Sequence, residues 1–217
     1  MYHFIIVREI VDKDYASLFV QKVGKRDKTT RCLFLNSEIA TLWQWDHFGV
    51  TDIILFNLYT GFRPSETLLL ENTNVNLDRW LVVGGMKTEA GTDRTVPIHE
   101  KVRHIVQRHY NPENKYLFCN ERLEFMIYDQ YRGRFKRIMS MLKMSHTLHE
   151  TRHTFISCAK SKRMDDNLLK LIVGHEIRDV TEAVYTHRPV TDLIEAIAII
   201  DYSGEDVLFD PVGCEWN

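Results

Sequence analysis

The chain has 217 residues, of which 44% are hydrophobic, and its 28 basic and 30 acidic side chains give a formal net charge of −2. This length and composition suit one globular domain with a full core and exclude a low-complexity chain. No run of 18 apolar residues and no signal-peptide pattern occurs, so we expect no membrane association and a cytoplasmic location. The cysteines Cys32, Cys119, Cys158 and Cys214 show no paired spacing, which disfavours a disulfide framework or a zinc site.

Helical spacing of apolar residues and the positions of capping and breaking residues predict a mainly helical chain. The predicted helices cover residues 36–45, with Asn36 or Ser37 as the cap, then 51–59, a short stretch after 63, 99–109, 127–142, 148–160, 167–173 and 190–200, with a turn or two around Tyr185. Two strand-like runs, Trp80–Val83 and Thr95–Ile98, flank a glycine-containing loop. They predict a small antiparallel sheet.

Two basic residues lie beside local structure that would hold them in place. Arg63 follows Gly61, a predicted helix terminator, and precedes Pro64, which suits the first turn of a new helix. A guanidinium at such a corner can donate two parallel hydrogen bonds to phosphate oxygens. Lys87 lies on the loop between the predicted strands, from which its ammonium could protonate a leaving alkoxide.

The segment Thr147–Glu150 fits a capping box, in which the first and last side chains satisfy opposing backbone donors at a helix start. The helix that follows places His149 and Arg152 three residues apart on one face, near its N-terminus. Backbone amides and the helix dipole favour an anion there. His149 and Arg152 are therefore suited to contact a phosphate.

Two further side chains complete this set. His175 follows Gly174, a predicted helix end, and Tyr185 comes 10 residues later. A tyrosine has a pKa of about 10 and is a poor nucleophile at neutral pH. It becomes effective where a base stands nearby and cationic groups stabilise the charge that develops on a phosphate. The whole set suits attack of a phenolic oxygen on a phosphodiester.

The small net charge conceals a basic segment. Residues 101–163 hold 14 Lys and Arg against 5 Asp and Glu, a net charge of +9, so the rest of the chain carries −11. Such a block is expected to contact nucleic-acid phosphates, with binding that weakens steeply as salt rises. The residues predicted to make these contacts are Arg132, Arg134, Lys136, Arg137, Lys160, Lys162 and Arg163.

From about Asn36 to Ile200 the chain resembles the tyrosine recombinases of the phage integrase family, in particular the integrases of conjugative transposons and prophages. The matching motifs, in chain order, are Thr60–Glu66, Met86–Thr88, His149–Thr154, Gly174-His175 and Tyr185–His187. The spacings agree as well, with 24 residues from Arg63 to Lys87 and 23 from Arg152 to His175. The resemblance implies a mainly α (α+β) catalytic domain, a helical bundle with a small antiparallel β-sheet on one edge.

The same resemblance implies site-specific cleavage and rejoining of DNA through a covalent 3′-phosphotyrosyl intermediate, without ATP, metal or any other cofactor. Arg63 and Arg152 would clamp the non-bridging oxygens of the scissile phosphate. Lys87 would protonate the departing 5′ oxygen. The arginines would thereby do the electrostatic work that a metal ion does in other enzymes.

The remaining roles implied by the resemblance concern proton transfer and support of the site. Tyr185 would be the nucleophile, and His149 its base. His175 would help to position the phosphate and to assist proton transfer. Glu66, three residues after Arg63, would be the carboxylate that supports the site.

The resemblance also divides the chain and implies its partners. Residues 1–35 would be the remnant of a preceding helical core-binding domain with its linker, 36–203 the catalytic domain and 204–217 a C-terminal tail. We expect a bacterial cytoplasmic or nucleoid protein, monomeric alone and tetrameric on double-stranded DNA attachment sites, with accessory DNA-bending or directionality factors. The helical segment 190–200 would dock on a neighbouring protomer. A chain shortened in this way is expected to bind DNA weakly and to recombine poorly alone.

Two alternatives stay open at this point. The stretch His149-Glu150-Thr151-Arg152-His153 also matches H-E-x-x-H, the zinc metalloprotease signature, with His175 or Glu176 as a third ligand. That interpretation leaves Arg63 and Tyr185 without a role, and its motif would begin in the first helical turn. The second alternative is a catalytically silent DNA-binding relative, against which the intact set of side chains argues. A type IB topoisomerase uses similar groups, but the Gly174-His175 motif favours the recombinase.

Overall fold

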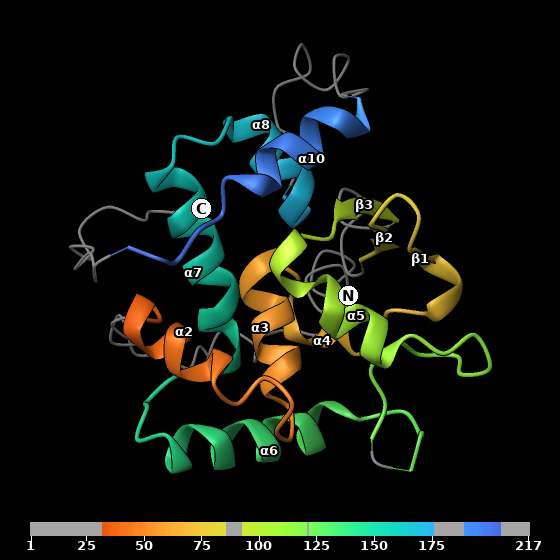
Figure 1. Ribbon diagram of the computed structural model, residues 1–217, viewed down its shortest axis with the longest axis vertical. Helices are drawn as coiled ribbons and strands as arrows, with labels where there is room; N and C mark the ends of the chain where they lie inside the picture. Colours follow the sequence, from red (N-terminus) through yellow and green to blue (C-terminus); the bar gives the residue numbers. More distant parts are fainter. Residues whose placement is uncertain (1–31, 86–92, 121, 176–188, 205–217) are drawn as a thin grey trace, which may run out of the picture. The chain divides into compact units, whose positions relative to one another are not determined.

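The computed structural model describes residues 32–85, 93–120, 122–175 and 189–204 (Figure 1). Within these ranges the chain is mostly helical. The helices are α2 (Asn36–Trp43), α3 (Thr51–Thr60), α4 (Pro64–Thr67), α5 (Arg103–His109), α6 (Tyr128–Met141), α7 (Leu148–Ser161), α8 (Asp166–Val173) and α10 (Val190–Ala198). Short 3-10 turns, η2 (Asn72–Asn74) and η4 (Glu100–Val102), precede β1 and α5.

One antiparallel sheet lies on an edge of the helices. It has the order β1-β2-β3, from β1 (Val75–Asn76), β2 (Leu81–Gly84) and β3 (Arg94–Pro97). In the longer ladder Gly84 pairs with Arg94 and Leu81 with Pro97. The predicted hairpin around Lys87 is therefore present at its base, although Lys87 itself lies outside the described residues.

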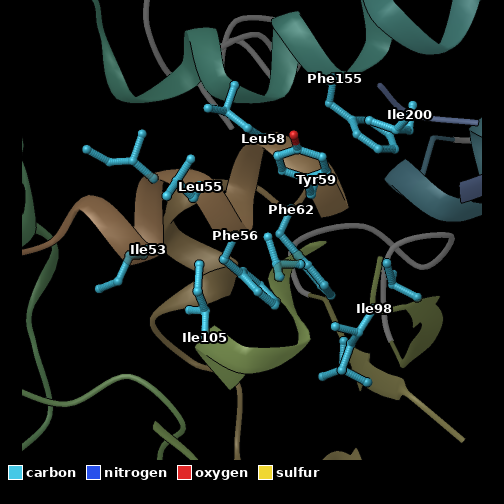
Figure 2. Close-up of a cluster of buried hydrophobic side chains, with 14 of the residues drawn as sticks. Ile53, Leu55, Phe56, Leu58, Tyr59, Phe62, Ile98, Ile105, Phe155 and Ile200 are labelled. Atoms are coloured by element: carbon cyan, nitrogen blue, oxygen red, sulfur yellow. The ribbon is translucent and has the colours of Figure 1, made fainter. Parts of the chain in front are cut away.

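Helix α3 is the centre of the core, because every residue from Thr51 to Thr60 is buried. Figure 2 shows Phe56 and Tyr59 of this helix among apolar side chains from other elements, such as Ile105 of α5 and Phe155 of α7. The Asn57 side chain, also on α3, accepts a hydrogen bond from the Thr67 hydroxyl at the end of α4. A helix surrounded on all sides gives the α3–α4 corner a rigid base.

The predicted elements recur with shifted ends. The sequence predicted Asn36 or Ser37 as the cap of α2, but Leu35 occupies the cap position. The Leu35 N–H donates to the Glu38 carboxylate at 2.8 Å. The helix ends at Trp43 rather than residue 45. Asp165 caps α8, so this helix begins at Asp166, one residue before the predicted start. The two-residue strand β1 was not predicted at all.

The fold class is the predicted one, a mainly helical domain with a small antiparallel sheet. No helix within the described ranges is long and apolar enough to cross a membrane. Most of the predicted domain remnant and linker, residues 1–31, and the predicted tail after residue 204 lie outside the described residues.

Candidate active site

The corner between α3 and α4 holds Arg63 in a defined position. Gly61 ends α3 with a left-handed φ of 69°, and Pro64 begins α4, with Arg63 as the residue between them that caps α4. A Cβ on Gly61 would lie 2.5 Å from the Phe155 ring of α7, so this corner also needs glycine for close packing. The predicted helix end at Gly61 and the new helix start at Pro64 are confirmed.

Glu66 fixes the Arg63 side chain from the first turn of α4. Its carboxylate accepts from the Arg63 backbone N–H at 3.0 Å and from Nη1 at 2.7 Å. The Glu66 side chain is only 2% exposed, whereas that of Arg63 is 21% exposed. Within the described residues Glu66 is the only side chain that bonds the Arg63 guanidinium, which has five N–H donors in all. Arg63 is thus oriented but retains donors for a ligand.

Arg152 reaches the same corner from α7. Its Nη1 donates to the Gly61 carbonyl at 2.8 Å and its Nη2 to the Val173 carbonyl at 2.7 Å. The first carbonyl lies two residues before Arg63, and the second two residues before His175. Arg152 therefore joins the α3–α4 corner to the end of α8, and it is 5% exposed.

A third arginine, Arg94 of β3, belongs to this cluster and was not predicted from the sequence. Its Nη2 donates to Glu66 at 2.7 Å and its Nε to the Ile172 carbonyl at 2.9 Å. Its Cζ lies 4.5 Å from the centre of the Phe62 ring, and the residue is 7% exposed. No local pattern marks Arg94, because its burial depends on partners 28 and 78 positions away.

The charges of this cluster do not cancel. Within the described part of the chain, Arg63, Arg94 and Arg152 carry +3 against the −1 of Glu66, and these groups perturb one another. Burial, followed by the charges of Arg63 and Arg94, lowers the pKa of Arg152 to about 9. Burial by itself raises the pKa of Glu66, but the hydrogen bond and charge of Arg94, together with the hydrogen bonds from Arg63, outweigh it and lower that pKa. An anion entering this site would relieve the repulsion among the guanidinium groups.

His175 lies beside the same charges, directly after the left-handed Gly174 that ends α8. Burial, followed by the charges of Arg152, Arg63 and Arg94, lowers the pKa of His175 to about 4. The imidazole is therefore neutral at pH 7. It can accept one hydrogen bond and donate another, as a group that positions a phosphate or relays a proton must.

His149 is exposed on the first turn of α7, one turn before Arg152. The described structure thus places Arg63, Glu66, Arg152 and His175 together, with His149 on the adjoining helix start. Lys87 and Tyr185 lie outside the described residues, so their positions stay predictions.

The predicted DNA-binding residues lie in two groups. Arg132, Arg134, Lys136 and Arg137 are on α6, on both sides of the stripe that α6 buries, and all but the partly exposed Arg134 are exposed. Lys160, Lys162 and Arg163 are exposed around the C-terminal end of α7. In Figure 1, α8 lies towards the upper end of α7 and α6 lies below its lower end. The 14 residues of α7 span about 20 Å at 1.5 Å per residue.

Glu150 of the H-E-x-x-H stretch has another use. Its Oε2 accepts the Thr147 N–H at 2.8 Å, as the predicted capping box requires, and lies 3.2 Å from Nδ1 of His146. Its Oε1 accepts the Cys32 N–H at 3.3 Å. Within the described residues no three His, Cys, Asp or Glu side chains are grouped as a metal site, while Glu176 lies outside them. The carboxylate thus caps α7 and anchors the chain that leads into α2, and the zinc protease is not favoured.

Known proteins place this geometry in context. Tyrosine recombinase XerA of Pyrococcus furiosus is 26% identical over an alignment of 157 residues, and the match covers 67% of this chain and 52% of that protein. The chain therefore spans about half the length of this curated relative. An integrase from mycobacterium phage Brujita has a similar fold, with a TM-score of 0.68 at 17% identity over 95% of this chain and 70% of its own.

The integrase of transposon Tn1549, solved in complex with circular intermediate DNA, superposes with a TM-score of 0.64 at 19% identity, covering 90% of this chain and 73% of its own. At such identities these two likenesses establish the fold. The family model described as "Phage integrase family" matches residues 36–191, a range that contains all six predicted catalytic positions. Because this match covers most of the chain, the protein belongs to the phage integrase family of tyrosine recombinases.

Proposed function

We propose that this chain carries the catalytic centre of a site-specific DNA recombinase, in which Tyr185 attacks a phosphodiester held by Arg63, Arg152 and His175. The observation that carries the proposal is a cluster, among the described residues, of three guanidinium groups near the Glu66 carboxylate, with Arg94 and Arg152 buried and Arg63 partly exposed. Guanidinium groups brought together in this way attract an anion, because like charges repel strongly where water is scarce. One phosphodiester would offset half of the +2 that these four side chains carry together.

Each step of the reaction has a group suited to it. The Tyr185 oxygen would bond to phosphorus while the bond to the 5′ oxygen breaks, and the tyrosine proton would pass to His149. Lys87 would give a proton to the departing 5′ oxygen. The guanidinium groups would stabilise the charge that builds on the non-bridging oxygens. A neutral His175 would donate to one of those oxygens.

The substrate proposed is a double-stranded DNA attachment site. The basic groups on α6 and around the C-terminal end of α7 are exposed or partly exposed. They would contact the DNA backbone, and their binding would weaken as salt rises. Assembly into a tetramer on DNA, and help from accessory factors, belong to the same proposal.

A covalent-trapping assay tests this function. The protein is incubated in EDTA with a duplex that carries a candidate attachment-site core and a 5′-bridging phosphorothiolate at the scissile position. The wild type should form an adduct that resists denaturant, and Tyr185→Phe should form none while binding DNA equally well. An adduct that persists in Tyr185→Phe would refute the assigned nucleophile.

If the wild type forms no adduct, two explanations are possible, and further measurements distinguish them. Retained DNA binding would favour the catalytically silent relative, unless a core-binding domain added in trans restores the adduct. Loss of binding together with stoichiometric zinc in the protein would instead favour the metalloprotease.

A further inference from the structure

Arg94, like Arg152, connects three parts of the candidate site, although the sequence did not single it out. It lies at the first position of β3, paired with Gly84, so it forms the base of the hairpin whose loop contains Lys87. Its guanidinium bonds Glu66 on α4 and the Ile172 carbonyl at the end of α8. Three segments that carry proposed catalytic residues therefore meet at one buried side chain.

The two oxygens of Glu66 are divided between two arginines. Oε1 accepts from Nη1 of Arg63 at 2.7 Å, and Oε2 accepts from Nη2 of Arg94 at 2.7 Å. Oε2 also accepts the backbone N–H of Arg63. Because a carboxylate is planar, fixing Oε2 from Arg94 fixes the direction in which Oε1 faces Arg63.

Arg94 is itself buried and held by several contacts. Its ring contact with Phe62 and its bond to Ile172 leave it little freedom to rotate, and burial lowers its pKa. Arg152 bonds the next carbonyl, that of Val173, so two guanidinium groups bind consecutive carbonyls at the end of α8. A group buried so fully has a fixed position from which to orient others.

We propose that Arg94 is a positioning residue for DNA cleavage: it holds the Glu66 carboxylate in the orientation that fixes the Arg63 guanidinium on the scissile phosphate. This role rests on the proposed function. Arg94 does not need to contact the DNA in it. Arg94 affects the reaction through Glu66. Its hydrogen bond to the Ile172 carbonyl also fixes the Glu66 carboxylate relative to the end of α8, which leads to His175.

A double-mutant cycle measures this coupling. Arg94→Met, Glu66→Gln and the double variant are compared with the wild type in single-turnover cleavage of the phosphorothiolate duplex at saturating DNA. Arg94→Met should lower the cleavage rate on the order of 100-fold, as expected for a slightly misplaced phosphate clamp, while the Kd for DNA changes less than about threefold. In the Glu66→Gln background the same substitution should cost less than about threefold, because the route through the carboxylate is already lost.

Two further variants keep the test decisive. Arg94→Lys retains the charge near Glu66 and should recover about tenfold of the lost rate, with a lysine unable to donate to both partners at once. Arg79→Met, an exposed arginine on the turn between β1 and β2, is the matched control and should cleave at the wild-type rate. If Arg94→Met does not fold, two comparisons of cleavage rate still test the positioning role. One compares Arg94→Lys with the wild type, and the other compares the double variant with Glu66→Gln.

The outcomes separate the two proposals. Equal costs of Arg94→Met in the wild-type and Glu66→Gln backgrounds would mean that Arg94 acts by packing or by touching DNA itself, and would overturn the positioning role. Wild-type cleavage by Arg94→Met would overturn it as well. A wild type that forms no adduct even when the core-binding domain is supplied would overturn the proposed function, and this role with it.

Discussion

Gly61→Ala should destabilise the protein and disturb the site together. A left-handed residue with a Cβ costs about 1–2 kcal/mol, and Gly61 has a φ of 69°. The new methyl would also lie 2.5 Å from Cδ1 and 2.7 Å from Cε1 of Phe155, a ring with no exposed surface. Overpacking of this kind costs about 1–3 kcal/mol, so the total is about 2–5 kcal/mol.

Thermal unfolding followed by circular dichroism measures this loss. For a chain of this size each kcal/mol lowers the Tm by about 2–4 °C, so we expect a fall of roughly 4–20 °C. The matched control is Gly133→Ala on α6, where no atom lies within 4 Å of the added Cβ. That variant should gain about 0.5–1 kcal/mol, as alanine does over glycine inside a helix.

The two glycine variants together test the reasoning about the corner. A Gly61→Ala protein with an unchanged Tm would show that the Phe155 ring moves away freely and that the corner is not rigid. The Gly61 carbonyl also accepts the Arg152 bond, so displacement of the corner should lower the rate of adduct formation. An unchanged rate in a destabilised protein would show that Arg152 does not depend on this carbonyl.

Three further predictions concern the stability of the described domain. Glu66→Gln should lower the free energy of unfolding, measured in urea, by about 3–5 kcal/mol, because it removes the Glu66 charge that pairs with the buried Arg94. Glu113 is exposed, so Glu113→Gln should lower it by almost nothing. The pKa of His175 is lowered in the folded protein to about 4, so its contribution to stability is present above pH 6.5 and is lost as the pH falls towards 4. His175→Gln should therefore flatten the curve of Tm against pH between these values. An equally steep curve would contradict this prediction. Tyr202→Phe removes the 2.7 Å bond from the buried hydroxyl to the Leu58 carbonyl and should cost about 1 kcal/mol in the same urea titration, and a cost near zero would mean that water replaces the bond.

The parts of the fold that sequence predicts are those encoded by neighbouring residues. Gly61 and Pro64 bound the Arg63 corner because each dictates its own backbone conformation. The capping bond from Thr147 to Glu150 starts α7 where the sequence places it. The predicted cap of α2 was wrong because Leu35, which no side-chain preference marks as a cap, occupies that position and donates its N–H to the Glu38 carboxylate inside the helix.

The candidate site is divided in the same way. The side chains that the family pattern marks could be named from sequence, and the described ones among them gather at the ends of α3, α7 and α8. Arg94 could not be named, because a charged residue at the start of a short strand is ordinarily exposed. Its burial arises from Glu66 and Ile172, which only the tertiary structure brings to it.

We propose that the guanidinium groups hold the scissile phosphate by their geometry as well as their charge. Single-turnover cleavage by Arg152→Lys, compared with Arg79→Lys on the exposed turn between β1 and β2, tests this idea. We expect the folded Arg152→Lys protein to bind DNA with a nearly unchanged Kd but to cleave on the order of 100–1,000-fold more slowly, while Arg79→Lys cleaves normally. A folded Arg152→Lys protein that forms adduct at the wild-type rate would contradict this role of the guanidinium geometry.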